Sequence, residues 1–396
     1  MPRSIPALVE PAVLEWARTS IGLSSVAASR RIGVPDERVD EWEAGDKQPT
    51  IAQLRKAAVV YKRSLGALFL SSPPADFDTM RDFRQQGDEE ADWSTQLHGE
   101  YRRAHFQRDC LLELAEIEDE PLSEDWQIEG LPSSEEEIGA VARAALERIA
   151  PIQIPQVSAT PYEHLNAWTA ALEEAGIMVL ATQRGGVSTT EMRAFSLYFD
   201  TMPVIVANGS DAVRGRLFSL LHEYAHLLLH TAGLCDITTD SRSLTGNRRL
   251  EARCNAIAAA TLMPRDRVLQ SSQVVQRRDA PESWDYPALS AAAAPFGVSA
   301  EAFLRRLVEL GQSTIDFYQI KRSEFLEAYE QEGLQRLSGG NWYRSAARDL
   351  GKAYVRRVSD AYKRRVIDSY TAASFLNVKV GQIPRLAEAA SIPAAS

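Results

Sequence analysis

Three of the chain's six histidines fall within nine residues, between His222 and His230. The first five residues of this run read His-Glu-x-x-His. Because residues four apart on an α-helix differ by about 40° around its axis, His222 and His226 are expected on one face. Two neighbouring imidazoles supply the first two ligands that a Zn²⁺ ion needs. Glu223 is then near enough to act on a water molecule without ligating the metal itself.

The residues around this motif predict a helix that packs against a core. Ser210 and Asp211 are typical helix-starting residues. Apolar residues then recur at helical spacing and predict a buried stripe, with the histidines and Glu223 mostly off it: Leu217, Leu220, Leu221, Tyr224, Leu227 and Leu228. The alternative is a core helix whose histidines are only hydrogen-bonded. It would bring two imidazoles and a carboxylate together without a cation, so the metal interpretation is preferred.

A catalytic zinc site takes three protein ligands and leaves one position for water. The extended pattern His-Glu-x-x-His-x-x-Gly-x-x-His is excluded because Leu229 and Ala232 stand at the Gly and third His positions. Glu251 is the better candidate, in an Ala-rich run that predicts a second helix ending at Pro264. The alternative for Glu251 is an ordinary first-turn acid favoured by the helix dipole. Asn255, on the same face, is placed to orient a ligating imidazole.

His230 extends the histidine-bearing face by one further turn. A histidine near the C-terminus of a helix is favoured electrostatically whatever its function. We therefore expect His230 to support the site or the helix end and not to bind the metal.

The segment from about Trp168 to Pro264 resembles the ImmA/IrrE metallo-endopeptidases, which are zincins. The matching runs are Arg193–Tyr198, Pro203–Asn208, Arg216–Phe218, His222–His230 and Glu251–Pro264. The resemblance implies that His222, His226 and Glu251 bind zinc and that Glu223 is the general base. Tyr224 and Ala225 depart mildly from the family's usual residues. The resemblance also implies cleavage of one specific protein partner, typically a DNA-binding repressor.

Two apolar, β-prone runs precede the predicted metal helix, at Phe195–Phe199 and Pro203–Ala207. They predict a hairpin or two adjacent strands. One of them is a candidate edge for an extended substrate that adds to the sheet as a further strand. Ordinary core strands are the equal alternative.

The N-terminal residues predict five short helices, at Pro11–Thr19, Ser24–Arg31, Asp36–Glu43, Ile51–Tyr61 and Leu65–Leu70. This pattern resembles the helix-turn-helix of Xre-family regulators, in which the third helix enters the major groove of DNA. Here the third helix carries five acids against Arg38, and residues 1–70 have a net charge of only +2. DNA binding depends largely on neutralising phosphates. Arg30, Arg31, Arg38 and Lys47 are candidate DNA contacts, and docking of a protein is the alternative.

The whole chain has 396 residues and a net charge of −10, which indicates two or three domains and no global nucleic-acid signature. Its three cysteines suit a reducing cytoplasm. No run of eighteen apolar residues and no signal peptide occurs, so we expect a cytoplasmic protein that has no membrane segment. The sequence leaves a homodimer open.

The expected organisation begins with an Xre-like domain at 1–70, a linker at 71–93 and an acidic helical segment at 94–150. A zincin-like domain at 151–310 and a partly basic helical region at 311–396 follow. Residues 88–137 carry a net charge of −14; a solvated face is preferred there over mimicry of nucleic acid. Residues 341–368 carry +5 with interleaved aromatics. They predict either a nucleic-acid-binding face or helices whose aromatics pack inward.

The sequence therefore predicts an α+β, mostly helical protein with a small sheet beside the metal helix. The preferred function is that of a zinc-dependent regulatory endopeptidase, with a helix-turn-helix module that binds DNA or a partner. The alternative is an antitoxin and transcriptional repressor that neutralises a toxin such as a PIN-like ribonuclease, with a latent or vestigial protease. That alternative follows from the resemblance of the combined architecture to such antitoxins.

Overall fold

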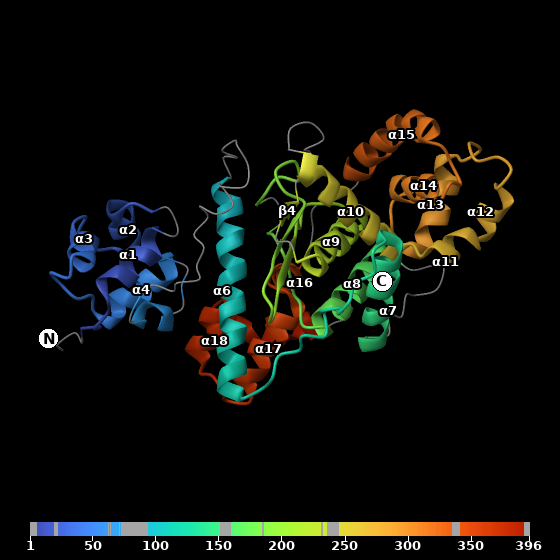
Figure 1. Cartoon of the computed structure of the whole chain (residues 1–396). Helices are drawn as coiled ribbons and strands as arrows, with labels where there is room; N and C mark the ends of the chain where they lie inside the picture. Colours follow the sequence, from blue (N-terminus) through green and yellow to red (C-terminus); the bar gives the residue numbers. More distant parts are fainter. Residues whose placement is uncertain are drawn as a thin grey trace. The chain divides into compact units, whose positions relative to one another are not determined.

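The computed structural model describes residues 6–19, 23–61, 63, 65–70, 72, 94–150, 160–183, 186–230, 233–235, 245–334 and 341–391. The chain forms two compact units, Met1–Glu113 and Leu114–Ser396. Over the described residues it is mostly helical and has one small sheet (Figure 1). The predicted α+β class, with an N-terminal helical domain and a sheet beside the His-Glu-x-x-His helix, is confirmed. The finer division at residues 70, 93, 150 and 310 stays a prediction.

The first unit contains the predicted group of short helices. They are α1 (Pro11–Thr19), α2 (Ser25–Ile32), α3 (Arg38–Glu43), α4 (Ile51–Tyr61) and the 3-10 turn η1 (Gly66–Phe69). Most of the long helix α6 (Thr95–Glu118) also belongs to this unit. The Ser24 hydroxyl caps α2, and Gly33 ends it in the left-handed conformation at φ 80°. The third helix begins two residues later than predicted, because Pro35 opens a turn that is closed by the Arg38 N–H.

The core of this unit lies between α2, α3 and α4. Ile32, Val39, Trp42, Leu54 and Tyr61 are buried within one apolar cluster. The Arg18 guanidinium donates two hydrogen bonds to the Glu43 carboxylate. This salt bridge joins α1 to α3 at the rim of the core. The acid at the end of α3 therefore serves the packing of the domain.

The second unit is built on a four-stranded sheet with the order β1-β3-β2-β4. The strands are β1 (Met178–Ala181), β2 (Ala194–Leu197), β3 (Val204–Ala207) and β4 (Gly233–Cys235). β1 runs parallel to β3, while β2 is antiparallel to both β3 and β4. The predicted adjacency of the two apolar runs is correct. The idea that one of them offers an edge is wrong, because β2 and β3 are the two inner strands of this sheet.

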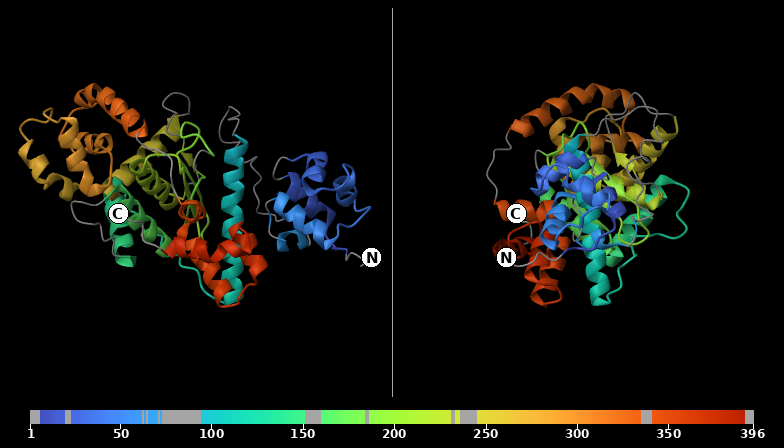
Figure 2. Two further views of the ribbon diagram at one scale, coloured as in Figure 1. Left: turned by 180° about the vertical axis from the view of Figure 1, so that it is seen from behind. Right: turned by 90° about the vertical axis from the view of Figure 1, so that its left-hand side faces the viewer.

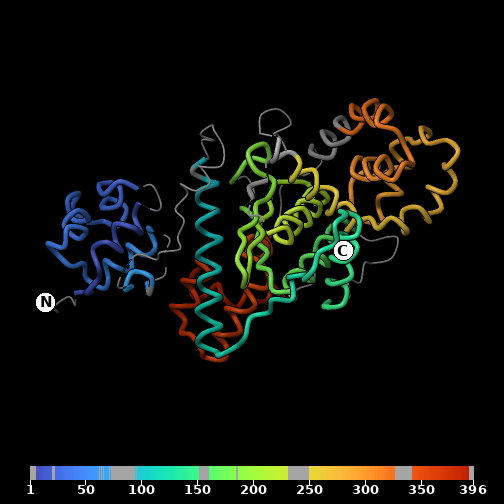
Figure 3. The backbone as a smooth tube through the Cα atoms, in the orientation of Figure 1, coloured from blue at the N-terminus to red at the C-terminus, as the bar shows by residue number. Residues whose placement is uncertain are grey.

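Four helices pack around this sheet and around one another. They are α7 (Glu135–Ile149), α8 (Pro161–Glu174), α9 (Val213–Leu228) and α10 (Thr245–Leu262). α9 lies against β2 and β3, α8 contacts α9 and β1, and α10 packs between α9 and α7. Figure 3 traces the backbone from β3 into α9, and Figure 1 shows α9 beside α10. A continuous apolar core joins these helices to the sheet.

The remaining helices of the second unit confirm the predicted helical C-terminal region. They are α11 (Arg265–Leu269), α12 (Ser272–Gln276), α13 (Tyr286–Ala293), η2 (Ala294–Phe296), α14 (Ala300–Glu309), α15 (Ile315–Leu334), α16 (Trp342–Leu350), α17 (Lys352–Lys363), α18 (Ser369–Leu376), η3 (Val380–Gln382) and α19 (Ile383–Ser391). In Figure 2, α11 to α15 form a yellow-to-orange group and α16 to α19 a separate red group. The aromatics of the red group are divided: Tyr354 is buried, whereas Trp342 is 52% exposed.

Several acids of the predicted acidic segment pair with arginines of the same unit. Glu118 at the end of α6 contacts Arg357 of α17 and Arg364, the residue that caps this helix. Glu136 of α7 contacts the buried Arg306. These contacts use negative charge to hold helices together, which supports a structural role for part of the segment.

The C-terminal helices contact both α8 and strand β1. The Glu173 carboxylate lies 3.5 Å from the Arg356 guanidinium and accepts a 3.4 Å hydrogen bond from the N–H of Ala353. Burial raises the pKa of Glu173 from 4.5 to about 7, against the opposing charge of Arg356. Gly351, at φ 85°, precedes α17; a Cβ there would lie 2.6 Å from the Val179 carbonyl oxygen. The close approach of α17 to β1 therefore requires glycine.

Replacing Glu173 by Gln is expected to flatten the pH dependence of stability in the second unit. The folded state keeps the Glu173 proton between pH 4.5 and 7, where an unfolded glutamate has lost it. The wild-type free energy of unfolding should therefore fall by about 3 kcal/mol as pH rises through this window. Urea unfolding followed by tryptophan fluorescence measures the slope. Glu174→Gln at the exposed neighbour is the control. Identical slopes in wild type and Glu173→Gln would contradict the prediction.

Gly139 is expected to be essential for the contact between α7 and α10. A Cβ at this position would lie 2.5 Å from the Ala260 Cβ and 2.9 Å from the Thr261 amide nitrogen. Gly139→Ala should therefore destabilise the second unit by about 1–3 kcal/mol, because the helices must separate. Gly99→Ala in α6, where the added Cβ meets nothing within 4 Å, is the control and should be neutral or slightly stabilising. Thermal unfolding that ranks the two variants the other way would refute this packing.

Candidate metal centre

Helix α9 carries the motif through the interior of the second unit. All its residues from Arg216 to Leu228 are buried except Phe218, which is partly buried. The predicted apolar stripe is therefore present, but the histidine-bearing face is buried as well. The helix begins at Val213 with Ala212 as its cap, so the prediction that Ser210 or Asp211 caps it is wrong. The Asp211 carboxylate instead accepts a hydrogen bond from the Ala212 N–H outside the helix.

His222, His226 and Glu251 meet at one point between α9 and α10. The two Nε2 atoms lie 3.1 Å apart, and oxygens of Glu251 lie 3.2 Å from His222 Nε2 and 3.3 Å from His226 Nε2. One ligand atom from each residue falls within 4.8 Å of the others. Both histidines are 1% exposed. Glu251 lies in the second turn of α10, which begins at Thr245, so its interpretation as a first-turn acid does not hold.

Residues of α10 hold the far side of each imidazole. His222 Nδ1 lies 2.9 Å from Asn255 Oδ1, and the side chain of Cys254 hydrogen-bonds to His226. An amide oxygen can only accept, so His222 Nδ1 donates to Asn255 and Nε2 is the ring nitrogen directed at Glu251. Asn255 thus orients the imidazole in the manner typical of metal-binding histidines.

The charges in this cluster shift one another's pKa values. Burial lowers the pKa of His226, but hydrogen bonds with Cys254 and Glu251 and the nearby Glu223 carboxylate raise it above its ordinary value. Burial raises the pKa of Glu251, but the hydrogen bonds with the two histidines lower this pKa by more than burial raises it. The net pKa therefore lies below 4.5. Both net shifts favour positive charge between the imidazoles and negative charge on Glu251. A divalent cation satisfies the same preference.

Glu223 is fully buried beside the two histidines. Its Oε2 accepts a 2.7 Å hydrogen bond from the hydroxyl of Ser196 on β2. No described residue hydrogen-bonds its Oε1. Burial raises the pKa of Glu223 above its usual range, although both histidines and Ser196 oppose the rise. One carboxylate oxygen is therefore fixed by the sheet, and the other remains as an acceptor.

These observations fit a bound metal ion. Two imidazole nitrogens and a carboxylate oxygen converge in an apolar region, and a fourth polar atom, Glu223 Oε1, has no described partner. Two histidines with one carboxylate is a donor set found in catalytic sites for divalent metals. The group can hold a metal ion with the residues present.

His230 does not continue the helical face as predicted. α9 ends at Leu228, and His230 follows it in the left-handed conformation at φ 53°. Its exposed ring lies 5.2 Å from that of Tyr198, with Nδ1 2.6 Å from the tyrosine hydroxyl. The reversal of the backbone after α9 turns His230 toward the end of β2, where it pairs with Tyr198.

The candidate DNA contacts lie in the first unit and are largely paired with acids. Arg30 contacts Asp36 at 2.8 Å, Arg38 contacts Glu41 at 2.8 Å, and Lys47 contacts Glu41 at 2.7 Å. Arg31 is exposed near the end of α2. The acids of the third helix therefore engage the side chains that were candidates for phosphate.

Three residues near the motif were not singled out from the sequence: Ser196, Tyr198 and Cys254. Ser196 is a buried hydroxyl within an otherwise apolar strand, and such a position usually has a polar partner. Cys254 precedes Asn255 and belongs to the same turn of α10. Tyr198 ends the run that contains Ser196. A search for buried polar residues in the predicted strand would have found Ser196; nothing local in the sequence indicates the contact of Cys254.

No helix of the described residues is long and apolar enough to cross a membrane. Residues 172–308 match the model of the IrrE N-terminal-like domain, Peptidase M78. Residues 14–68 match a helix-turn-helix model. No curated protein and no solved structure gives a significant match to the chain. The chain thus combines a segment similar to helix-turn-helix domains with a segment similar to the IrrE N-terminal-like domain, and these matches confirm the architecture that the sequence predicts.

Proposed function

We propose that the chain is a zinc-dependent regulatory endopeptidase that cleaves one specific protein partner. The observation that carries this proposal is the meeting of His222, His226 and Glu251 beside a buried carboxylate with one oxygen unengaged by the described residues. His222, His226 and Glu251 would hold the ion. Zinc is the proposed metal because two imidazoles and one carboxylate form a known ligand set of catalytic zinc sites. Such a site leaves the fourth position for water. When bound, the metal would polarise a peptide carbonyl and acidify a water molecule.

Glu223 moves the proton. Its Oε2 is occupied by the Ser196 hydroxyl, so Oε1 accepts the proton from the attacking water. The protonated carboxyl then gives the proton to the departing amide nitrogen. Burial assists this exchange, because the raised pKa of Glu223 brings its protonated form closer to neutral pH. Ser196 keeps the carboxylate in one orientation while the proton moves.

Asn255 and Cys254 support the ligands. Asn255 holds the Nδ1 proton of His222 and so keeps the Nε2 lone pair directed at the metal position. Cys254 supports His226 from the same turn of α10. Partners of this kind typically change metal affinity about 10–100-fold when they are removed.

A second candidate function is that of an antitoxin and repressor that binds a toxin, for example a PIN-like ribonuclease. The ion pairs of the helix-turn-helix domain favour it. Asp36 and Glu41 engage three of the four candidate basic residues, so these three side chains are not free to contact phosphate. We therefore expect the domain to bind a protein partner, alone or together with DNA.

Zinc content is expected to depend on the two histidines and cleavage on Glu223. Elemental mass spectrometry should find about one zinc per chain in the wild type and none in His222→Ala/His226→Ala. His164→Ala, which removes an equally buried imidazole in α8, should retain zinc and is the control. Absence of zinc from the reconstituted wild type would overturn the proposal.

The product of the neighbouring gene is the partner to test for cleavage. Glu223→Gln should retain zinc and lose about 10²–10⁴-fold in cleavage rate, because the proton acceptor is gone. Fragments measured by mass spectrometry from wild type but not from Glu223→Gln would support the peptidase. A neighbouring toxin neutralised equally by wild type and Glu223→Gln, without fragments, would instead support the antitoxin.

Glu41→Gln is expected to strengthen DNA binding by the helix-turn-helix domain. It releases both Arg38 and Lys47, so the slope of log K against log salt should steepen by about 1 to 2. Fluorescence anisotropy with a duplex DNA at several salt concentrations measures the slope. Glu10→Gln, an exposed acid before α1, is the control. An unchanged slope in Glu41→Gln would show that these side chains do not meet phosphate.

A further inference from the structure

A cavity of about 500 Å³ lies in the second unit, apart from the metal ligands. It is bounded by α8, the strand β1, the first turns of α9 and the junction between α16 and α17. None of His222, Glu223, His226 or Glu251 lines it. Cavities of this size commonly hold small organic molecules.

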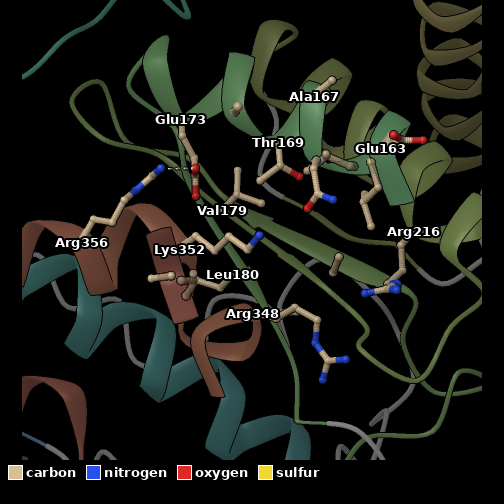
Figure 4. Close-up of a pocket in the computed structure, with 18 of the residues that line it drawn as sticks. Glu163, Ala167, Thr169, Glu173, Val179, Leu180, Arg216, Arg348, Lys352 and Arg356 are labelled. Carbon is tan, nitrogen blue, oxygen red and sulfur yellow. Dashed lines mark ion pairs between the residues drawn. The ribbon is translucent and has the colours of Figure 1, made fainter. Parts of the chain in front are cut away.

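Basic side chains reach this cavity from opposite sides. Arg216 of α9 enters from one side and Lys352 of α17 from the other, while Arg348 of α16 and Arg356 also line it (Figure 4). Four cations from three helices thus surround one space. Arg348 is ion-paired with Asp349 and Arg356 with Glu173. An anion between Arg216 and Lys352 would relieve the repulsion of the remaining positive charge.

Arg216 is the most telling of these residues. Its residue surface is only 4% exposed, and its Nε atom has no hydrogen-bond partner among the described residues. Tyr162 lies against the guanidinium, with the ring centroid 5.7 Å away, but no carboxylate pairs with it. Tyr162 also hydrogen-bonds to Arg216, and Asp211 acts on its charge. The buried Nε–H still has no acceptor among the described residues, and because such a donor is costly, this indicates a missing partner. Burial lowers the pKa of Arg216, and the nearby Arg348 lowers it further.

The two acids of the cavity wall are already engaged. Glu163 accepts hydrogen bonds from the Thr160 N–H and hydroxyl in the capping box of α8. Glu173 is held by Arg356 and by the Ala353 N–H. Neither acid is hydrogen-bonded to Arg216. Burial and the neighbouring Arg356 also lower the pKa of Lys352, a shift that a bound anion would reverse.

Most of the remaining lining is apolar, although Asn166, Thr169 and Ser391 also contribute to it. Val179 and Leu180 of β1, Leu220 of α9 and Leu165 of α8 form this part of the wall. No aromatic side chain lines the cavity, so the described wall offers no surface on which a base could stack. An occupant that suits both parts of the wall has an anionic group at one end and an aliphatic body.

We propose that this cavity binds a small organic anion, one that carries a phosphate or carboxylate group on an aliphatic body. Its anionic group lies between Arg216 and Lys352, and its body lies against β1 and Leu220. Because Arg216 is on α9 and Lys352 on α17, the ligand links the helix of the metal centre to the C-terminal helices. Arg216 precedes His222 by six residues, about 9 Å along the helix.

Calorimetric titration of the full chain at low ionic strength tests the proposal with four probes: hexyl phosphate, hexanoate, hexanol and inorganic phosphate. Hexyl phosphate or hexanoate should bind in a saturable manner, and the better of the two identifies the anionic group. Hexanol should not bind. Affinity for the better probe should fall about tenfold or more in Lys352→Gln and in Arg216→Gln, since each loses a charged hydrogen-bond donor.

Two controls and a second test variant keep the result specific. Arg214→Gln, on α9 but outside the cavity lining, should bind as the wild type does. The His222→Ala/His226→Ala variant should also bind, which separates this site from anion binding at a metal and makes the result independent of the proposed peptidase. Lys352 lies at the partly exposed rim, so its variant reports on binding if Arg216→Gln does not fold.

Three outcomes would overturn the proposal. The first is that neither organic anion binds. The second is that binding is unchanged in Lys352→Gln, which would place the anion elsewhere. The third is that inorganic phosphate binds as tightly as hexyl phosphate, which would leave the apolar wall without a part in recognition.

Discussion

The contact between α9 and α10 is the constraint on which the second unit depends. α9 is buried on all sides, yet it carries two histidines and a glutamate into that interior. Such groups are tolerated only when each finds a partner. α10 supplies Glu251 and Asn255 to His222, and Glu251 and Cys254 to His226. The sheet supplies Ser196 to Glu223. The packing of α9 against α10 and β2 therefore also assembles the metal centre.

Ion pairs within the chain also decide how its charge is used. The net charge of −10 and the strongly acidic segment suggest a surface available to partners. Some of these acids instead form ion pairs within the unit, since Glu118 and Glu136 contact arginines of other helices. The helix-turn-helix domain does the same, where Glu41 engages Lys47 and Arg38. Charge counted along a sequence therefore overstates what either surface offers to a partner.

Sequence patterns correctly predicted which residues share a face within one helix. They did not correctly predict where that helix begins and ends. The spacing of His222 and His226 correctly places both rings on one side of α9, 4.8 Å apart. The same reasoning fails for His230, because α9 stops at Leu228 and the backbone turns to a positive φ. It fails also for Ser210 and Asp211, because the helix begins at Val213 and Ala212 is its cap. Helix ends depend on the surrounding turn, and periodicity carries no information about it.

The sequence by itself determined the local geometry: the shared face of the two histidines, the turn that separates Glu251 from Asn255, and the two apolar strands. Each of these follows from a period of 3.6 or 2 residues. Tertiary structure alone decided the partners. Ser196 meets Glu223 across 27 residues, β2 and β3 lie inside the sheet, and Arg216 faces Lys352 across a cavity. Such contacts depend on how elements distant in sequence pack, and the period of any one element does not encode that packing.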